Sequence, residues 1–407
     1  MNPAEPRGRR IAIFSRYGLA DQFDLAAEFK DMLEILTSRN DVLHLSFSST
    51  RPKPEVPPEL CVREFRAMIN RHSPRDVQLK FILMYFYLPV IAFRLRKFKP
   101  DLIFLSEIMP LMGLMLKWMT GTRVATGYGD WHFHNMLGAK IWSKPLLALA
   151  EKLDRFEVLR MDGLFCRAAT AGERAKCWGL PAERVRVVRD APDPNAFFPH
   201  DMSELRRHCG FDETSMVLLY HGVMHSGKGL DKLIAWVNDL YLEDSRVGLI
   251  LVGGGPEQGA LRQQAASLAV SQRVVFTGWL KTIKEVGDYC NAADICVAMR
   301  TASEANARIV PGALLHAMAC RKLVVAPRLS GMQEIIREGD NGYLFAPDDG
   351  GDFKRLIRCL AANRADWLRV AENAYQDIIN NYSVQASARQ YAAALESFAG
   401  GVNHEKP

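Results

Sequence analysis

The sequence predicts an α/β protein made of two Rossmann-like domains that face each other across a cleft. The chain has 407 residues, which is long enough for two domains with separate hydrophobic cores. Short, continuously apolar runs rich in β-branched residues recur in both halves, and such runs form the doubly buried strands of parallel sheets. Glycine-containing turns and amphipathic stretches follow them, which gives the strand–turn–helix repeat of parallel α/β folds.

The first half opens with this repeat. The expected strands are residues 10–14, 41–47, 101–105, 124–126 and 185–188. An amphipathic helix is expected over residues 23–36, and the proline-rich residues 51–58 are expected to form a loop. Ligands of open α/β sheets bind at the carboxyl ends of strands, so the loops after these strands are the places to look for a site.

Residues 81–93 form an aromatic run without any charge, and four basic residues follow it at Arg94, Arg96, Lys97 and Lys99. One interpretation is a buried helix that is broken at Pro89. The other is an interfacial segment whose aromatic side chains enter lipid headgroups beside a basic cluster. A second apolar run over residues 108–119 favours the interfacial segment.

The charge distribution also favours an anionic partner for the first half. The whole chain has a formal net charge of +6, but residues 1–190 hold 30 basic and 21 acidic residues, whereas residues 191–407 hold 22 and 25. We therefore expect the first half to meet a phospholipid surface or a phosphate-bearing acceptor, and we expect no nucleic-acid partner.

The expected location is the cytoplasm. The eight cysteines are scattered without a C-x-x-C pair, which is typical of free thiols in a reducing compartment. Residues 1–10 are polar and precede one short apolar run, so no signal peptide is expected. No charge-free apolar run approaches the ~18–20 residues that a membrane-spanning helix needs.

The second half begins with an expected strand at residues 216–220, a glycine-rich turn at 221–229 and a helix from Leu230. Backbone N–H groups in such a turn, the helix dipole and the ammonium of Lys228 together suit a diphosphate. Further strands are expected at residues 249–252, 274–277 and 294–297, each of the first two before a glycine turn. No G-x-G-x-x-G follows the first strand of the chain, which argues against a dinucleotide-dependent dehydrogenase.

Residues 300–345 organise this half. Pro311 and Gly312 open an apolar-faced helix, residues 323–326 form a buried strand, and Ser330 and Gly331 break that strand before a helix resumes at Glu334. Glycine at such a break lets a backbone approach a ligand closely. A last helix is expected over residues 383–398.

At these residues the chain resembles the retaining GT-B glycosyltransferases of family 4. The stretches HAMACRKLVVAP (residues 316–327), SGMQEII (330–336) and DNGYLF (340–345) match the order and spacing of the donor-site pattern in that family. The resemblance implies an acceptor-binding domain at residues 1–190, a nucleotide-sugar-binding domain at 191–382, and a C-terminal helix and tail at 383–407 that cross back to the first domain. Its interdomain segment corresponds to Asp190 to Asn195, where we place the hinge.

The resemblance also implies the donor site. The residues expected at the donor sugar and diphosphate are Gly222, Lys228, Gly229, Gly254, Arg308, His316, Ser330, Gly331 and Glu334, and those at the base are Gly278 and Trp279. The pattern differs from that of the family at its charged anchors. Val223 replaces an arginine, the two glutamates of the E-x7-E pair are replaced by Arg308 and His316, and Ala313 replaces the lysine of a variant form.

The remaining candidates lie in the first half. Many members of the family carry a histidine where Gly129 stands here, and nearby residues are candidate substitutes for it: Asp130, His132 and His134. Isolated histidines are usually ordinary polar loop residues, but this cluster at a strand end makes them candidate catalytic residues. Arg16, Tyr17 and Gly18 follow the first strand on the expected acceptor side.

The resemblance predicts an enzyme that moves a sugar, with retention, from a nucleoside diphosphate donor to a lipid-linked or polysaccharide acceptor. It implies no cofactor, and no metal if Lys228 and helix N-termini carry the leaving diphosphate. The alternative is a catalytically silent GT-B homologue that acts as a partner subunit or binding protein, because function belongs to sites and not to folds. A sugar-nucleotide epimerase of the same architecture is a third interpretation.

Overall fold

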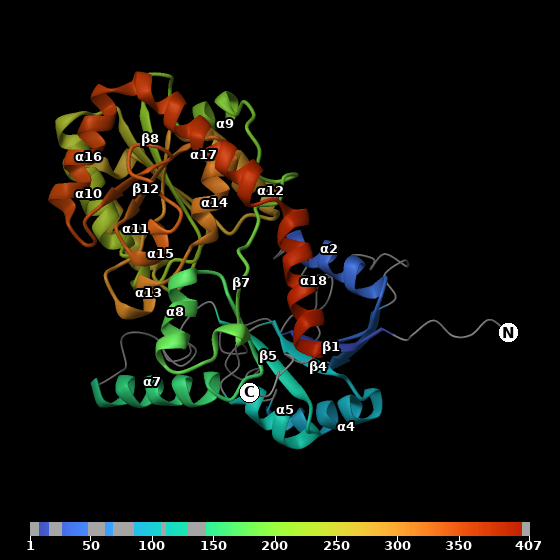
Figure 1. Cartoon of the computed structure of the whole chain (residues 1–407). Helices are drawn as coiled ribbons and strands as arrows, with labels where there is room; N and C mark the ends of the chain where they lie inside the picture. Colours follow the sequence, from blue (N-terminus) through green and yellow to red (C-terminus); the bar gives the residue numbers. More distant parts are fainter. Residues whose placement is uncertain are drawn as a thin grey trace. The chain divides into compact units, whose positions relative to one another are not determined.

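The computed structural model describes residues 8–15, 27–47, 62–67, 85–106, 111–128 and 144–400. The chain divides into two compact units (Figure 1): Met1–Asp190 with Val384–Pro407, and Ala191–Ser383. Each unit is built on one parallel sheet with helices, so the predicted α/β fold with two Rossmann-like domains is confirmed. Among the described residues, no helix combines the length and the apolarity needed to cross a bilayer.

Unit 1 contains a seven-stranded sheet in the order β3-β2-β1-β4-β5-β6-β7. Its strands are β1 (Arg10–Ser15), β2 (Asp41–Phe47), β3 (Val62–Ala67), β4 (Leu102–Leu105), β5 (Arg123–Tyr128), β6 (Gly163–Cys166) and β7 (Val185–Val187). Its helices are α2 (Ala27–Thr37), α4 (Leu88–Phe98), α5 (Met112–Thr120), α7 (Lys144–Val158), α8 (Ala169–Cys177) and α18 (Val384–Gly400). All six strand pairings are parallel.

The two faces of this sheet have separate cores, because successive side chains of a strand point to opposite faces. Ile11 and Ile13 of β1 face α2 and α18, whereas Ala12 and Phe14 face α4 and α5. Phe398 of α18 lies so close to Gly163 that a Cβ there would be 2.6 Å from the phenyl ring. The last helix of the chain is thus an integral part of unit 1.

Pro89 lies in the first turn of α4, and a turn at Tyr87 separates α4 from the helical residues Tyr85 and Phe86, so the helix is interrupted directly before this proline. Proline is tolerated there because the missing N–H has no helical partner in the first turn. The inner side chains of α4, among them Leu88, Ile91 and Leu95, are buried against the sheet. Residues 81–84 of the aromatic run lie outside the described residues.

Unit 2 contains a six-stranded parallel sheet in the order β10-β9-β8-β11-β12-β13. Its strands are β8 (Met216–His221), β9 (Val247–Val252), β10 (Val274–Gly278), β11 (Ile295–Val297), β12 (Leu323–Pro327) and β13 (Tyr343–Phe345). Its helices are α9 (Ser203–His208), α10 (Leu230–Glu243), α11 (Gln258–Ala266), α12 (Ile283–Ala292), α13 (Glu304–Ala307), α14 (Gly312–Ala319), α15 (Ser330–Gln333), α16 (Gly350–Ala362) and α17 (Trp367–Asn381). The strand order reverses between β8 and β11, and such a switch point leaves a crevice at the carboxyl ends of the strands.

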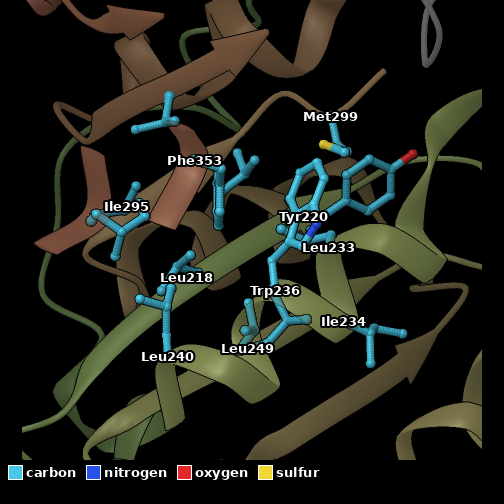
Figure 2. Close-up of a cluster of buried hydrophobic side chains, with 14 of the residues drawn as sticks. Leu218, Tyr220, Leu233, Ile234, Trp236, Leu240, Leu249, Ile295, Met299 and Phe353 are labelled. Carbon is cyan, nitrogen blue, oxygen red and sulfur yellow. The ribbon is translucent and has the colours of Figure 1, made fainter. Parts of the chain in front are cut away.

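The core of unit 2 lies between this sheet and α10 and α16. Leu218, Leu249 and Ile295 come from three adjacent strands, and Figure 2 shows them among Leu233, Trp236, Leu240 and Phe353. The Phe353 ring is fully buried, 5.3 Å from the centroid of Trp236 and 5.2 Å from that of Phe345. This packing holds the sheet in place, and the candidate site lies at the carboxyl ends of its strands.

One predicted element is wrong. The helix expected to resume at Glu334 instead occupies Ser330–Gln333, and Glu334 is its C-cap. The side chain of Asn341 explains why no helix follows: its Oδ1 accepts from the N–H of Arg337 at 2.7 Å, and its Nδ2 donates to the carbonyl of Ile335 at 2.9 Å. These bonds use backbone groups that a continuing helix would need.

Candidate functional site

The candidate site lies in unit 2, at the carboxyl ends of β8 and β11. The turn that follows β8 is tied to the loop that follows β11, since the carbonyl of Gly227 accepts from the N–H of Thr301 at 3.2 Å and from Nδ2 of Asn306 at 3.0 Å. Gly229 ends this turn with φ +64°, and a Cβ on it would be 2.9 Å from the Thr301 side chain. Glycine is therefore required there on both conformational and steric grounds.

Lys228 is the last residue of this turn before Gly229, and α10 follows directly. A 3-10 turn spans Ser226–Lys228, and Nδ1 of its N-cap residue His225 accepts from the N–H of Gly227 at 3.2 Å. Helix α10 begins two residues after Lys228, so its N-terminal N–H groups and positive dipole end lie beside the lysine. A turn of this kind binds an anion through backbone donors and adds one full positive charge.

The glycine turns of the neighbouring strands form the next part of the site. The carbonyl of Gly222 lies so near Gly253 that a Cβ there would be 2.4 Å away, and the N–H of Gly253 donates to the carbonyl of Gly278 at 3.0 Å. Gly254 lies directly against Trp279, since a Cβ added at Gly254 would be 2.8 Å from the indole nitrogen of Trp279. The structure thus brings together four of the predicted residues, and the Trp279 side chain is 66% exposed beside them.

His316 lies in a cluster of stacked rings. The centroid of its ring is 3.8 Å from that of Phe197, with 8° between the planes, and 5.2 Å from that of His221, with 12° between the planes. His221 is the last residue of β8 and was not predicted to belong to the site. The signal that could have found it is its position directly before Gly222, at the end of a buried strand.

Both histidines of this cluster are held in the neutral form. Burial lowers the pKa of His221 to about 4, although a hydrogen bond with the Ala313 backbone opposes that shift, and the charge of Lys228 lowers the pKa further. Burial, and then the neighbouring His221, lower the pKa of His316 well below its usual value. Nε2 of His221 and Nδ1 of His316 are buried and have no hydrogen-bond partner within the described ranges.

These histidines make the stability of the protein depend on pH. Because the folded-state pKa of His221 is depressed, the unfolded chain takes up the proton first as the pH falls below about 6.5. The contribution of neutral His221 to stability is fully present above that pH, and it is lost as the pH falls toward the folded-state pKa of about 4. We expect His221 alone to lower the free energy of unfolding by about 2 kcal/mol between pH 7 and pH 5.

Urea unfolding of His221→Gln at the two pH values is the measurement, and the difference should shrink by about that amount. Replacing the exposed His208 of α9 by glutamine is the control and should keep the wild-type difference. An equal pH dependence in His221→Gln and in the wild type would contradict the assignment.

Arg308 and the residues around it bond to other parts of the protein. Nη1 of Arg308 pairs with Oε1 of Glu304 at 2.5 Å. Ser330 donates from its hydroxyl to the carbonyl of Ala307 at 2.7 Å. A Cβ on Gly331 would be 2.6 Å from the carbonyl oxygen of Ile309, so the close approach that requires this glycine is to the chain itself.

The candidate residues of the first half follow β1 and β5 in the sequence. Arg16, Tyr17 and Gly18 lie outside the described residues, as do Asp130, His132 and His134. The strands before them, β1 and β5, both pair with β4. In the part of the chain that the structure describes, no three His, Cys, Asp or Glu side chains are grouped so as to hold a metal ion.

Comparisons with known proteins place this site in context. Residues 215–363 match the family model described as "Glycosyl transferases group 1". The N-acetyl-alpha-D-glucosaminyl L-malate synthase of Bacillus anthracis is 27% identical over 165 residues, which are 40% of this chain and 41% of that protein. The lipopolysaccharide core biosynthesis glycosyltransferase LpsE of Rhizobium meliloti is 27% identical over 236 residues, 58% of this chain and 64% of LpsE. The matches thus span less than two thirds of either relative.

Solved structures show similarity over nearly the whole chain. HepE of Anabaena, in complex with UDP and glucose, has a TM-score of 0.71 at 20% identity and covers 96% of this chain and 100% of its own. The sucrose-phosphate synthase of Thermosynechococcus elongatus has a TM-score of 0.76 at 17% identity and covers 95% of this chain and 98% of its own. At such identities the likeness shows the fold.

Proposed function

Since residues 215–363 carry the sequence pattern of the group 1 glycosyltransferases in a chain with the GT-B fold, we propose that this protein is a retaining glycosyltransferase of family 4. It moves a sugar from a nucleoside diphosphate to a carbohydrate or lipid-linked acceptor. Unit 2 binds the donor. Unit 1 binds the acceptor, with Arg16, Tyr17 and Gly18 on the acceptor side and Asp130, His132 and His134 as catalytic candidates.

The donor roles follow from the site. Lys228, Gly229 and the N-terminus of α10 bind the diphosphate, and they stabilise the charge that develops on it as the bond to the sugar breaks. Gly278, Gly254 and the exposed Trp279 receive the base. Neutral His316 hydrogen-bonds one ribose hydroxyl, and Arg308, Ser330, Gly331 and Glu334 lie on the sugar side. In this arrangement the lysine and the helix dipole serve the leaving group, and no metal is required.

One observation carries this proposal. The turn that leads from β8 to Lys228 contacts the glycine turns that follow the neighbouring strands β9 and β10, because Gly222 lies against Gly253 and Gly254 lies against Trp279. The lysine turn and the exposed Trp279 side chain thus follow strands of the same sheet within the residues that match the family model, which supports a site with both an anion-binding part and an aromatic part. A nucleoside diphosphate needs both.

A catalytically silent homologue that acts as a partner subunit is the second candidate. Specific observations favour it: Val223 stands where the family has an arginine, His316 stands where it has a carboxylate, and the guanidinium of Arg308 is paired with Glu304.

We further propose that the protein works in the cytoplasm, peripheral to the inner face of the cell membrane, where lipid-linked acceptors are held.

Thermal shift and calorimetric titration with UDP, GDP, ADP and their sugars test the function. We expect one of these ligands to bind with a Kd on the order of 0.1–1 mM. Val223 and His316 cannot make the charge-assisted hydrogen bonds of the arginine and carboxylate that they replace, and each such bond accounts for about tenfold or more in affinity. Uridine compounds come first, since the similar HepE was solved with UDP and glucose.

The matching nucleosides are the control for this screen and should bind more weakly, because they have no phosphate for the lysine turn. If no nucleotide sugar binds at about 10 mM, the silent homologue is the better description.

A further inference from the structure

Large apolar side chains are exposed in an uneven way on unit 1. Eight of them are exposed among its described residues, and five of these lie on α4, on α5 or directly before α4. The five are Phe86, Val90, Phe93, Met115 and Trp118, which we call the α4–α5 face. Trp118 is 87% exposed and Phe86 is 75% exposed, so this face leaves two of its three aromatic rings almost entirely in water.

The exposure of α4 follows from its own sequence. Val90, Phe93 and Lys97 are spaced at helical intervals of three and four residues, which puts them on one side of α4, and the exposed Phe86 lies just before the helix. The opposite side, which includes Leu88, Ile91 and Leu95, is buried against the sheet. Helix α4 is therefore apolar on both sides, and only one side has a partner in unit 1.

Helices α4 and α5 form one continuous surface. Nε of Arg96 donates to the carbonyl of Met119 at 2.8 Å, and Figure 1 shows the two helices next to each other at the margin of unit 1. On α5, Met112 and Leu116 are buried, whereas Met115 and Trp118 point outward at a spacing of three residues. The outward sides of both helices thus contribute to the same face.

The charges on these helices all have one sign. Residues 85–99 and 111–121 contain five basic residues and no acidic residue, namely Arg94, Arg96, Lys97, Lys99 and Lys117. Lys117 forms an ion pair with Asp162. Arg94, Lys97 and Lys99 are exposed beside the apolar side chains. The partner of this face must accept apolar groups and carry negative charge.

We propose that the α4–α5 face docks on an anionic phospholipid membrane. Phenylalanine and tryptophan side chains enter the boundary between headgroups and acyl chains, while lysine and arginine bind the anionic headgroups. Phe86, Phe93 and Trp118 beside Arg94, Lys97 and Lys99 supply both contacts on two short helices. This inference deepens the peripheral membrane location proposed above and is independent of the transfer reaction, because docking requires neither donor nor acceptor.

Cosedimentation of the full chain with vesicles tests the proposal. Vesicles of phosphatidylcholine with 30% phosphatidylglycerol as a probe are compared with pure phosphatidylcholine, at about 50 and 500 mM salt. We expect binding to the anionic vesicles only, and a marked loss at high salt. The variant Arg94→Gln with Lys97→Gln and Lys99→Gln should bind about 100-fold more weakly, since each charge near the surface contributes about fivefold.

A second variant, Phe93→Ser with Trp118→Ser, should also lose binding, although all of its charges remain. The matched control is Leu242→Ser with Leu368→Ser, which removes two exposed apolar side chains from unit 2 and should bind as the wild type does. Thermal unfolding of each variant checks that the chain is folded.

Three results would overturn the proposal: no binding of the wild type to anionic vesicles, binding that both α4–α5 variants retain, or an oligomer in solution that Phe93→Ser with Trp118→Ser dissociates. The last result would identify a second copy as the occupant. The assay contains no nucleotide sugar, so a protein that binds vesicles but no donor would contradict only the proposed transferase function.

Discussion

Replacing Lys228 by alanine is expected to weaken the binding of a nucleoside diphosphate sugar about 100-fold. A charge-assisted hydrogen bond to a phosphate contributes about 1.5–3 kcal/mol. The lysine lies two residues before α10, and in the variant the helix N-terminus alone would remain to bind the anion. If the wild-type Kd is on the order of 0.1–1 mM, a 100-fold weaker affinity puts the Kd of the variant beyond the range that titration can measure.

Calorimetric titration of the wild type and Lys228→Ala with the ligand found in the screen is the measurement. Lys354→Ala is the matched control, because it removes another lysine of unit 2 that pairs with Asp239 of α10 at 2.6 Å. The control should bind the ligand as the wild type does. If Lys228→Ala binds equally well, the turn is not the diphosphate site, and the roles proposed for its neighbours fail with it.

Strands β9 and β12 of unit 2 could be predicted from the sequence because they are buried on both faces. Residues 247–252 and 323–327 are continuous apolar runs, and every residue in them is buried. Two strands of unit 1 escaped prediction for opposite reasons. Strand β3 (VREFRA) is a polar edge strand, and edge strands commonly carry charges that block further pairing. Strand β6 is only four residues long, and its Gly163 is explained by Phe398, which is 235 positions later.

The site divides in the same way. The turn of Lys228 and Gly229 is a local pattern, so the sequence could place it. The ring cluster is not local, since Phe197, His221 and His316 come from three separate segments that only the folded sheet brings together. Likewise, the sequence shows that Glu304 is near Arg308 but not that the two side chains form an ion pair. Contacts between distant segments depend on packing, which no single stretch of sequence encodes.

The differences from the family pattern predict a gain of affinity when they are reversed. In His316→Glu with Val223→Arg, we expect nucleotide-sugar binding to tighten by about 100-fold, because two charge-assisted hydrogen bonds are restored. Val223 is 46% exposed in the turn before Lys228, so an arginine can be placed there without displacing the core. A carboxylate at position 316 accepts from both ribose hydroxyls at once, which a neutral imidazole cannot do.

The double variant will also lack the stacking of His316 on Phe197, which contributes about 0.5–1.5 kcal/mol, so its unfolding is measured alongside its binding. His316→Gln with Val223→Leu is the matched control, since it changes the same two positions without adding charge, and its affinity should stay near that of the wild type. Titration with inorganic pyrophosphate separates the two positions: Val223→Arg should tighten its binding, whereas His316→Glu should act only on ligands that contain the ribose. If the double variant binds no better than this control, His316 and Val223 do not face a donor. The stacked histidines would then have to be explained by another ligand or by packing alone.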